Sequence, residues 1–414
     1  MVSIARKNLF EDIPRFLVAQ AGIMFAVSLV TIQLGILNGF TRSTARLIDQ
    51  SDADIWVAAE EMVHFELTQP MPLEQMVEAR EVEGVRRAEA LMLSGGRWRS
   101  PDGKIGPLRI IGFDPGGQLF NTGEILEGDR AALQRPFSIM TDETNLGSLR
   151  LEGVGDEAEI NSAPVSIVGL TKGTQSIVSS TMLFTSLENA KAYSTSGLRS
   201  SVFCSVQSGD GLNCTTTYEA QDENEEAVPE IRPLTIADSI AYVLIQAEPG
   251  TDLEQLKQRL EETIPDIQAL TKTEMADQTR SYWQLRTGIG FILGLGATVG
   301  VIVGMVIVGQ ILYSSVSDHL REYGTLKAMG ASDRMIYSII VEQALWMAVL
   351  GYVPSVGLCL GLGAWTFATQ GIMILITPVM ASAIFGITVV MCVGSALFAI
   401  QKVTHVDPAI VFKA

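Results

Sequence analysis

The chain has 414 residues, of which 47% are hydrophobic, and its mean hydropathy is +0.28. This is more apolar than a soluble domain of that size requires, so a membrane protein is indicated first. Residues 38–286 hold 21 Lys and Arg against 39 Asp and Glu (21 − 39 = −18), and the remainder holds 8 against 7. Such an acidic block excludes nucleic acid as a partner, because phosphate contacts need a basic surface.

The chain begins with two predicted membrane elements. Apolar residues recur at helical spacing over residues 1–15, which predicts an amphipathic helix on the cytoplasmic membrane surface. Residues 16–37 carry no charge and, as a helix, cover about 33 Å, enough to cross a bilayer. The run is long for a cleaved signal peptide, so we expect an uncleaved transmembrane helix. Arg6, Lys7 and Arg15 place the N-terminus in the cytoplasm.

The acidic block, residues 38–286, is expected to be an α+β domain of two lobes outside the cytoplasm. The predicted strands are Ala53–Ala58, Arg86–Leu93, Leu108–Phe113, Ala158–Val168, Met182–Thr185 and Tyr242–Ala247. Helices are predicted at Leu187–Tyr193 and from Leu253 to Ile264. Thr271 and Glu274 have the spacing of a capping box, so a further helix is expected to start there and to run into the second span.

The sequence offers little that could carry catalysis. Its three histidines, His64, His319 and His405, are far apart in the sequence, and only His64 lies in the acidic block, so we expect no histidine metal site there. Neither a nucleophile-elbow motif nor a Gly-x-x-x-x-Gly-Lys-Ser/Thr phosphate loop occurs. We therefore expect a non-catalytic subunit without a cofactor of its own.

The four cysteines fall into two pairs. Cys204 and Cys214 lie in a polar part of the acidic block, and a disulfide between them is as consistent with the sequence as two free thiols. Cys359 and Cys392 lie within apolar runs, where packing is the expected role.

The second span is predicted at residues 287–316. Its glycines recur at spacings of four, which in lipid allows another helix backbone to approach closely. Gly290, Gly294, Gly296, Gly300 and Gly304 are the predicted packing positions. The simpler alternative is that glycine is common in membrane helices.

The end of the chain is predicted to cross the membrane twice more. The 59 residues between Glu342 and Lys402 are uncharged, too many for one crossing. We predict a third span at 336–363, a short periplasmic turn at 364–371, a fourth span at 372–401 and a cytoplasmic tail at 402–414. Pro354 and Pro378 are expected to kink these helices. Four spans place both termini and residues 317–335 in the cytoplasm.

Residues 317–335 contain the most specific motif of the chain. The run Arg321-Glu322-Tyr323-Gly324-Thr325-Leu326-Lys327-Ala328-Met329-Gly330-Ala331 closely resembles the coupling-helix loop of FtsX/MacB-superfamily permeases. Glu342 with Gly351, and Asp407-Pro408-Ala409, also resemble motifs of that family, and Gly351-Tyr352-Val353-Pro354 resembles its DevC-like subgroup. Taken as residues alone, the segment is a short amphipathic helix. Tyr323, Leu326 and Met329 would enter a partner's apolar groove, with Arg321, Glu322 and Lys327 at its rim and with Gly324 and Gly330 allowing close approach and chain reversal. A solvated connector is the alternative.

The resemblance implies a bacterial inner-membrane permease that forms a homodimer and binds two copies of a separate ATPase, which holds the ATP and Mg²⁺. It implies mechanotransmission, in which ATP-driven motion reaches the periplasmic domain, and for the DevC-like subgroup it implies a periplasmic adaptor (membrane fusion protein), an outer-membrane channel and a glycolipid or other hydrophobic cargo. Two other interpretations stay open. One is an FtsX-like regulatory transducer that activates a periplasmic enzyme without transport, and the other is a membrane-anchored receptor.

Overall fold

The fold consists of two compact units in a computed structural model that describes residues 13–176, 179–196, 199–206, 212–219, 231–370 and 374–404. The sheet unit is Thr41–Trp283, and the helical unit combines the chain up to Phe40 with the chain from Gln284 onward. The predicted N-terminal amphipathic helix lies, up to residue 12, outside the described residues. So do His405, the Asp407-Pro408-Ala409 motif and the end of the predicted tail.

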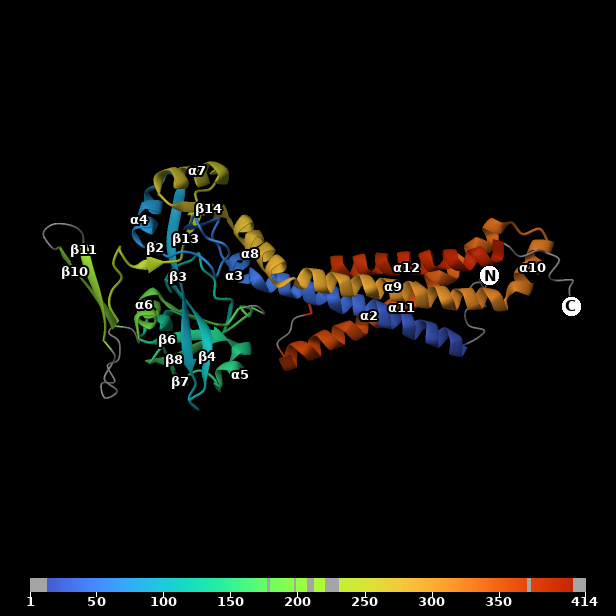
Figure 1. The fold of residues 1–414 in the computed structure, drawn as a ribbon, viewed down its shortest axis with the longest axis horizontal. Helices are drawn as coiled ribbons and strands as arrows, with labels where there is room; N and C mark the ends of the chain where they lie inside the picture. Colours follow the sequence, from blue (N-terminus) through green and yellow to red (C-terminus); the bar gives the residue numbers. More distant parts are fainter. Residues whose placement is uncertain are drawn as a thin grey trace. The chain divides into compact units, whose positions relative to one another are not determined.

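The sheet unit is built on one mixed sheet (Figure 1). Its strand order is β14-β1-β13-β3-β4-β9-β6-β8-β5, with β7 paired to β3 and β8. Only the β4–β9 and β6–β8 pairs are parallel. The strands are β1 (Ile55–Ala59), β3 (Val85–Arg99), β4 (Ile105–Phe113), β5 (Glu124–Gly128), β6 (Ser138–Asp142), β7 (Glu157–Ile160), β8 (Ala163–Lys172), β9 (Thr181–Ser186), β13 (Tyr242–Ala247) and β14 (Ile267–Thr271). A separate short pair is β2 (Met71–Pro72) with β12 (Ser239–Ile240).

Both faces of the sheet are buried, because successive strand residues point to opposite sides and both sets are apolar. On β1, Ile55 and Val57 join one core cluster, and Trp56 and Ala58 join the other. The first cluster includes residues of α4 (Glu74–Glu81), α6 (Leu187–Thr195) and α7 (Leu253–Thr263). The second includes residues of α3 (Arg46–Gln50) and α8 (Lys272–Thr287). The sheet is thus the middle layer of an α+β domain, as predicted.

Most strands lie where the sequence predicts them, and one prediction is wrong. Residues 158–168 are not a single strand, because the chain reverses at Asn161 and Ser162 between β7 and β8. Both residues have positive φ, 50° and 75°, the backbone of a tight hairpin turn. The short helices η1 (Arg130–Gln134), η2 (Glu143–Asn145) and α5 (Leu146–Leu149) complete the unit.

The helical unit contains four helices long and apolar enough to cross a membrane within the described part of the chain. They are α2 (Ile13–Thr44, which runs into the sheet unit), α9 (Ile289–Asp318), α11 (Asp333–Gln370) and α12 (Pro378–Thr404), with the short α10 (Leu320–Ala328) between α9 and α11. Helices suit a bilayer because their backbone hydrogen bonds are satisfied within the segment. One apolar cluster with residues of all five helices forms the core of the unit.

Three expectations for the helices need correction. The helix that begins near Thr271 does not continue into the second span, because Gly288 adopts a left-handed conformation (φ 61°) between α8 and α9. α11 extends through Gln370, over most of the predicted turn. Pro354 lies inside α11, but Pro378 is the first residue of α12, where a missing N–H breaks no helical bond and causes no kink.

The two cysteines of the acidic block lie opposite each other in a separate hairpin. β10 (Arg199–Val206) pairs antiparallel with β11 (Leu212–Glu219), and the register aligns Cys204 with Cys214. Directly opposed residues of an antiparallel pair have Cα atoms about 4.5–5.5 Å apart, within the range that a disulfide spans. A two-stranded hairpin alone is marginally stable in water, so a covalent link would stabilise it.

We therefore predict a Cys204–Cys214 disulfide in protein exported to an oxidising compartment. Alkylation of unfolded protein without reductant, followed by peptide mass spectrometry, should give a linked peptide pair that separates on reduction. The buried Cys359 and Cys392 should be alkylated without reduction in the same sample. Alkylation of Cys204 without reductant would contradict the prediction.

Candidate functional site

The predicted coupling segment forms a helix with a well-defined end. α10 follows α9 directly at His319 and closes at Gly330, whose φ is 96°. There the Ala331 N–H donates to the Leu326 carbonyl (2.9 Å) and the Gly330 N–H donates to the Lys327 carbonyl (3.0 Å). This pair of bonds is the Schellman motif, which needs a left-handed residue and therefore favours glycine. The chain thus reverses at a fixed point before α11.

The two faces of α10 differ from the prediction. Tyr323, expected in a partner's groove, is 2% exposed and belongs to the apolar core of the helical unit. Leu326 is half-buried against the same core. Met329 is 71% exposed, and Arg321 and Glu322 are exposed with it. Tyr323 therefore anchors α10 to its own chain, and Met329 at its C-cap is exposed.

Lys327 also has a partner within the chain. Its Nζ lies 2.9 Å from Asp333 Oδ1, at the first residue of α11, and its side chain is largely buried. An ion pair between the last turn of α10 and the first turn of α11 suits both helix dipoles. Gly324 is buried, and the Lys327 ammonium group is already paired with Asp333 of α11.

Three of the five predicted packing glycines lie against neighbouring helices. A β-carbon at Gly304 would lie 2.4 Å from Met391 Sδ of α12 and 2.7 Å from Ala26 Cβ of α2. At Gly300 it would lie 3.1 Å from Val30 of α2. At Gly304 the distances are shorter than β-carbon contacts in proteins, so a side chain there would displace a neighbouring helix, whereas at Gly300 the neighbour would have to move by only a few tenths of an ångström.

Gly296 faces only the end of a flexible side chain, and the first two glycines face open space. A β-carbon at Gly296 would lie 2.7 Å from Gln33 Nε2. Around Gly290 and Gly294 no described atom lies within 4 Å of that position. The stripe predicted as one surface therefore divides into a packed half and an open half.

A second small-residue surface, which the sequence reading missed, lies on α11. A β-carbon at Gly351 would lie 2.4 Å from Ile23 Cγ2 of α2. One turn later the Ser355 hydroxyl donates to the Gly351 carbonyl (2.6 Å), and the Cys359 thiol lies 3.7 Å from the Ser28 carbonyl of α2. The spacing Gly351–Ser355–Cys359 was the available signal, since small residues four apart let membrane helices approach.

The one histidine of the sheet unit is a packing residue. The His64 ring stacks on Tyr282 with centroids 4.2 Å apart and meets Trp283 edge-on. Burial, followed by the charge of Arg109, lowers the pKa of His64 to about 4, so the ring is neutral near pH 7. Its Nδ1 accepts a hydrogen bond from the Glu66 N–H (3.2 Å). Across the described ranges no group of three or more metal-ligating side chains occurs.

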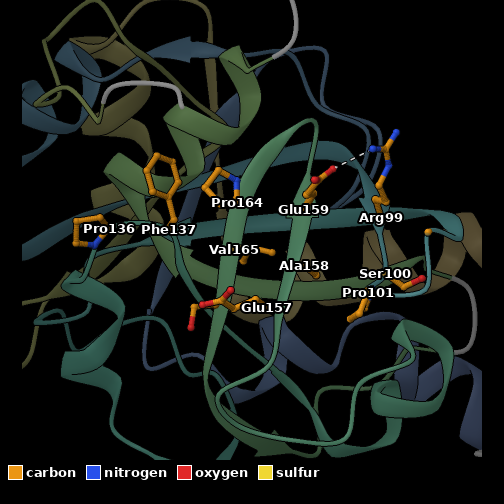
Figure 2. A pocket seen from close by; sticks show the side chains of 12 residues that line it. Arg99, Ser100, Pro101, Pro136, Phe137, Glu157, Ala158, Glu159, Pro164 and Val165 are labelled. Carbon is orange, nitrogen blue, oxygen red and sulfur yellow. Dashed lines mark ion pairs between the residues drawn. The ribbon is translucent and has the colours of Figure 1, made fainter. Parts of the chain in front are cut away.

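The sheet unit also has an open hollow of about 490 Å³ beside the β7–β8 hairpin (Figure 2). Arg99 and Glu159 form an ion pair (3.3 Å) on one side, and Phe137 and Pro136 lie on the other. Phe137 has a φ of 55°, an unusual conformation for an aromatic residue.

Two family models match the chain over consecutive parts. The MacB-like periplasmic core domain matches residues 16–263, and the FtsX-like permease C-terminal domain matches residues 294–408. Together with the four membrane helices, these matches define a multi-pass membrane protein of the ABC exporter permease class. The chain belongs to the MacB-like periplasmic core domain family, with an FtsX-like C-terminal region.

Similar individual proteins are distant. The pyoverdine export ATP-binding/permease protein PvdT of Pseudomonas syringae pv. syringae (strain B728a) is 22% identical over 201 residues. That match covers 47% of this chain and 30% of PvdT, so the chain spans less than a third of that protein. The periplasmic region of MacB from Actinobacillus actinomycetemcomitans matches at 9% identity and a TM-score of 0.33, covering 54% of this chain and 90% of that one. A domain of a putative permease from Porphyromonas gingivalis matches at 12% and 0.32, covering 53% and 89%.

The divided glycine stripe predicts unequal effects of the same substitution. Gly304→Val should lower the free energy of unfolding by about 1–3 kcal/mol, because the added methyl groups overlap α2 and α12. Gly294→Val is the matched control on the same helix and should change the monomer's stability little. Thermal unfolding in detergent, followed by size-exclusion chromatography, compares the two. Equal loss of folded protein in both variants would contradict the packing described here.

The pKa of His64 predicts how stability depends on pH. Its folded-state pKa of about 4 is below the unfolded value near 6.5, so the unfolded chain binds the proton more readily. Stability should be full above about pH 6.5 and fall as the pH is lowered towards 4, by up to about 3 kcal/mol. His64→Phe, which keeps an aromatic ring against Tyr282, should remove this part of the slope. Thermal unfolding measured across that range in both proteins checks it, and identical slopes would rule it out.

Proposed function

We propose that this chain is the permease subunit of an exporter whose ATP is hydrolysed by a separate subunit bound at α10. The observation that carries the proposal is the combination of a buried Tyr323 in α10 with an exposed Met329 at the C-cap of the same helix. A residue fixed in the core of the helical unit and a neighbour exposed to a partner make α10 a rigid contact. Force applied at Met329 passes through Tyr323 to the spanning helices. Methionine is also well suited to an apolar groove, because its side chain adapts to the surface it meets.

The orientation follows from charge. Arg321, Lys327 and Arg334 place α10 in the cytoplasm by the positive-inside rule, together with both termini. The matched family model is named for a periplasmic domain, which supports a location of the sheet unit on the side opposite α10. We propose that two copies of the chain bind two ATPase subunits, which hold ATP and Mg²⁺. Motion generated at α10 then displaces the periplasmic unit.

The cargo is proposed to be a glycolipid, another lipid or a different hydrophobic molecule, passed on through a periplasmic adaptor and an outer-membrane channel. The DevC-like features at Gly351–Pro354 support this choice. The relative PvdT is named for pyoverdine export, which supports export as the broader activity. Purification in mild detergent should recover an adaptor and a channel with the chain. Recovery of a cell-wall hydrolase instead would favour the regulatory transducer.

The division of α10 into two faces predicts two distinct mutant phenotypes. Met329→Asp should reduce permease-stimulated ATP hydrolysis by at least about tenfold, because a carboxylate in an apolar groove is costly, while the chain stays folded. Tyr323→Ala should instead destabilise the chain by about 3–5 kcal/mol, because it leaves a cavity in the core. The measurements are hydrolysis by the reconstituted complex and thermal unfolding of the permease alone.

Val77→Asp in α4 controls for a charge placed at an exposed apolar position, and it should change neither measurement. Full stimulation of hydrolysis in Met329→Asp would reject α10 as the coupling contact.

A further inference from the structure

The chain passes between the two units at only two places. The division falls after Phe40, within α2, and after Trp283, within α8. On the sheet-unit side, the first crossing leads through the end of α2 into α3, and the second is α8 itself. Any displacement that reaches the sheet unit through the chain must arrive through these segments.

The two crossings are linked inside the sheet unit by an ion pair. Arg280 Nη2 of α8 lies 2.7 and 2.6 Å from the two carboxylate oxygens of Asp49 on α3. Asp277 holds the same guanidinium through Nη1 at 2.8 Å, which fixes its plane. The Arg280 side chain is 25% exposed and that of Asp49 is 37% exposed, so this pair is partly shielded from water. Apolar residues of both helices lie in the same core cluster beneath it.

α3 also contacts the loop after β8, through Arg46 before Asp49 and Gln50 after it. Arg46 Nε and Gln50 Nε2 both donate to the Gly173 carbonyl, the second at 3.2 Å. Gly173 has a φ of 88°, and a β-carbon there would lie 2.9 Å from Arg46 Nη2. One five-residue helix therefore binds both α8 and the loop that follows β8.

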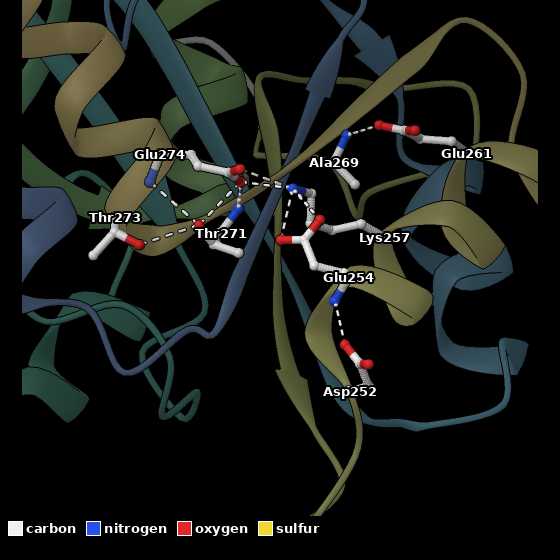
Figure 3. Close-up of polar contacts among 8 residues, drawn as sticks. All are labelled: Asp252, Glu254, Lys257, Glu261, Ala269, Thr271, Thr273 and Glu274. Atoms are coloured by element: carbon white, nitrogen blue, oxygen red, sulfur yellow. Dashed lines mark hydrogen bonds and ion pairs between the residues drawn. The ribbon is translucent and has the colours of Figure 1, made fainter.

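The beginning of α8 is braced separately. The predicted capping box is present: the Thr271 N–H donates to Glu274 Oε2 (2.8 Å), and the Glu274 N–H donates to Thr271 Oγ1 (3.3 Å). Lys257 of α7 reaches Glu274 at 2.7 Å and Glu254 at 3.2 Å (Figure 3). α8 is thus fixed at its first turn by α7, and at its middle by α3.

We propose that α3 is a joint that makes the two crossings and the Gly173 loop move as one body, with Asp49 and Arg280 as its positioning residues. The inference rests on the proposed function, because it concerns how ATP-driven motion enters the periplasmic unit. Besides the ion pair, Lys272 Nζ at the start of α8 donates to the Ser51 carbonyl just after α3 (3.0 Å). Further along, α3 and α8 share apolar packing, which is non-directional and permits sliding where no ion pair fixes the direction. With the ion pair, a tilt of either helix is imposed on the other.

The experiment uses the full-length chain with its ATPase in lipid nanodiscs, with the four native cysteines replaced by alanine. Spin labels at Arg42→Cys and Ser281→Cys report the distance between the two crossings, both positions being exposed. Labels at Ile105→Cys and Phe291→Cys report displacement of the sheet unit when a nonhydrolysable ATP analogue is added. Asp49→Asn combined with Arg280→Gln should broaden the first distance distribution and abolish the nucleotide-dependent shift of the second.

Two controls separate this role from general stability. Exchange of the charges, Asp49→Arg with Arg280→Asp, should restore both readouts. Asp102→Asn with Arg150→Gln removes another ion pair, also 2.6 Å long, elsewhere in the sheet unit, and should change neither. Unfolding temperatures of all variants should stay close to that of the parent chain.

The outcomes distinguish the joint from the proposed function. A narrow Arg42–Ser281 distribution and a preserved shift in the Asp49→Asn, Arg280→Gln variant would overturn the joint. If the labelled chain that keeps Asp49 and Arg280 shows no nucleotide-dependent shift, mechanotransmission is overturned. The Arg42–Ser281 distance distribution would then still decide whether α3 is a joint. Failure of the charge exchange to restore either readout would also count against the pair.

Discussion

The structure depends first on how the backbone N–H and C=O groups find hydrogen-bond partners where there is no water. In the spans, lipid supplies no hydrogen-bond partner, so the chain must be helical, and the helices can associate only where side chains are small enough for close contact. Gly300 and Gly304 on α9 and Gly351 on α11 meet this requirement against α2. α2 is consequently in contact with α9 and α11, and it is the same helix that enters the sheet unit. The arrangement of the membrane helices thus follows from a few positions without a side chain.

The sheet unit has a different requirement, which is to cover both faces of its central sheet. Its central strands are apolar on both faces, so each face needs a cover, and α3 and α8 provide one of them. The helices that cover this face are also those that carry the chain to and from the membrane. The same helices therefore pack on the sheet and connect it to the membrane spans, and the ion pair between Asp49 and Arg280 joins α3 to α8. A partly exposed ion pair of this kind contributes little to stability, so the proposed role of the pair is directional.

Much of this could be predicted from the sequence, because the strongest signals are local. The spans follow from uncharged runs, the strands from alternation, and the capping box from residues three apart. The orientation of α10 could not be predicted, since Tyr323 within the helix and Met329 at its C-cap are both largely apolar and only the core decides which is buried. The hairpin at Asn161 was missed because an alternating pattern continues through a two-residue turn. The α3 contacts were beyond reach, because Asp49 and Arg280 are 231 residues apart.

The sheet unit begins and finishes at neighbouring places. Its first large strand, β1, pairs directly with its last, β14, and the segments outside them are held together by Asp49 and Arg280. An insertion whose ends lie together imposes no separation on the helices that flank it. The sheet unit can therefore be enlarged, trimmed or exchanged in evolution without rearranging the membrane helices that flank it.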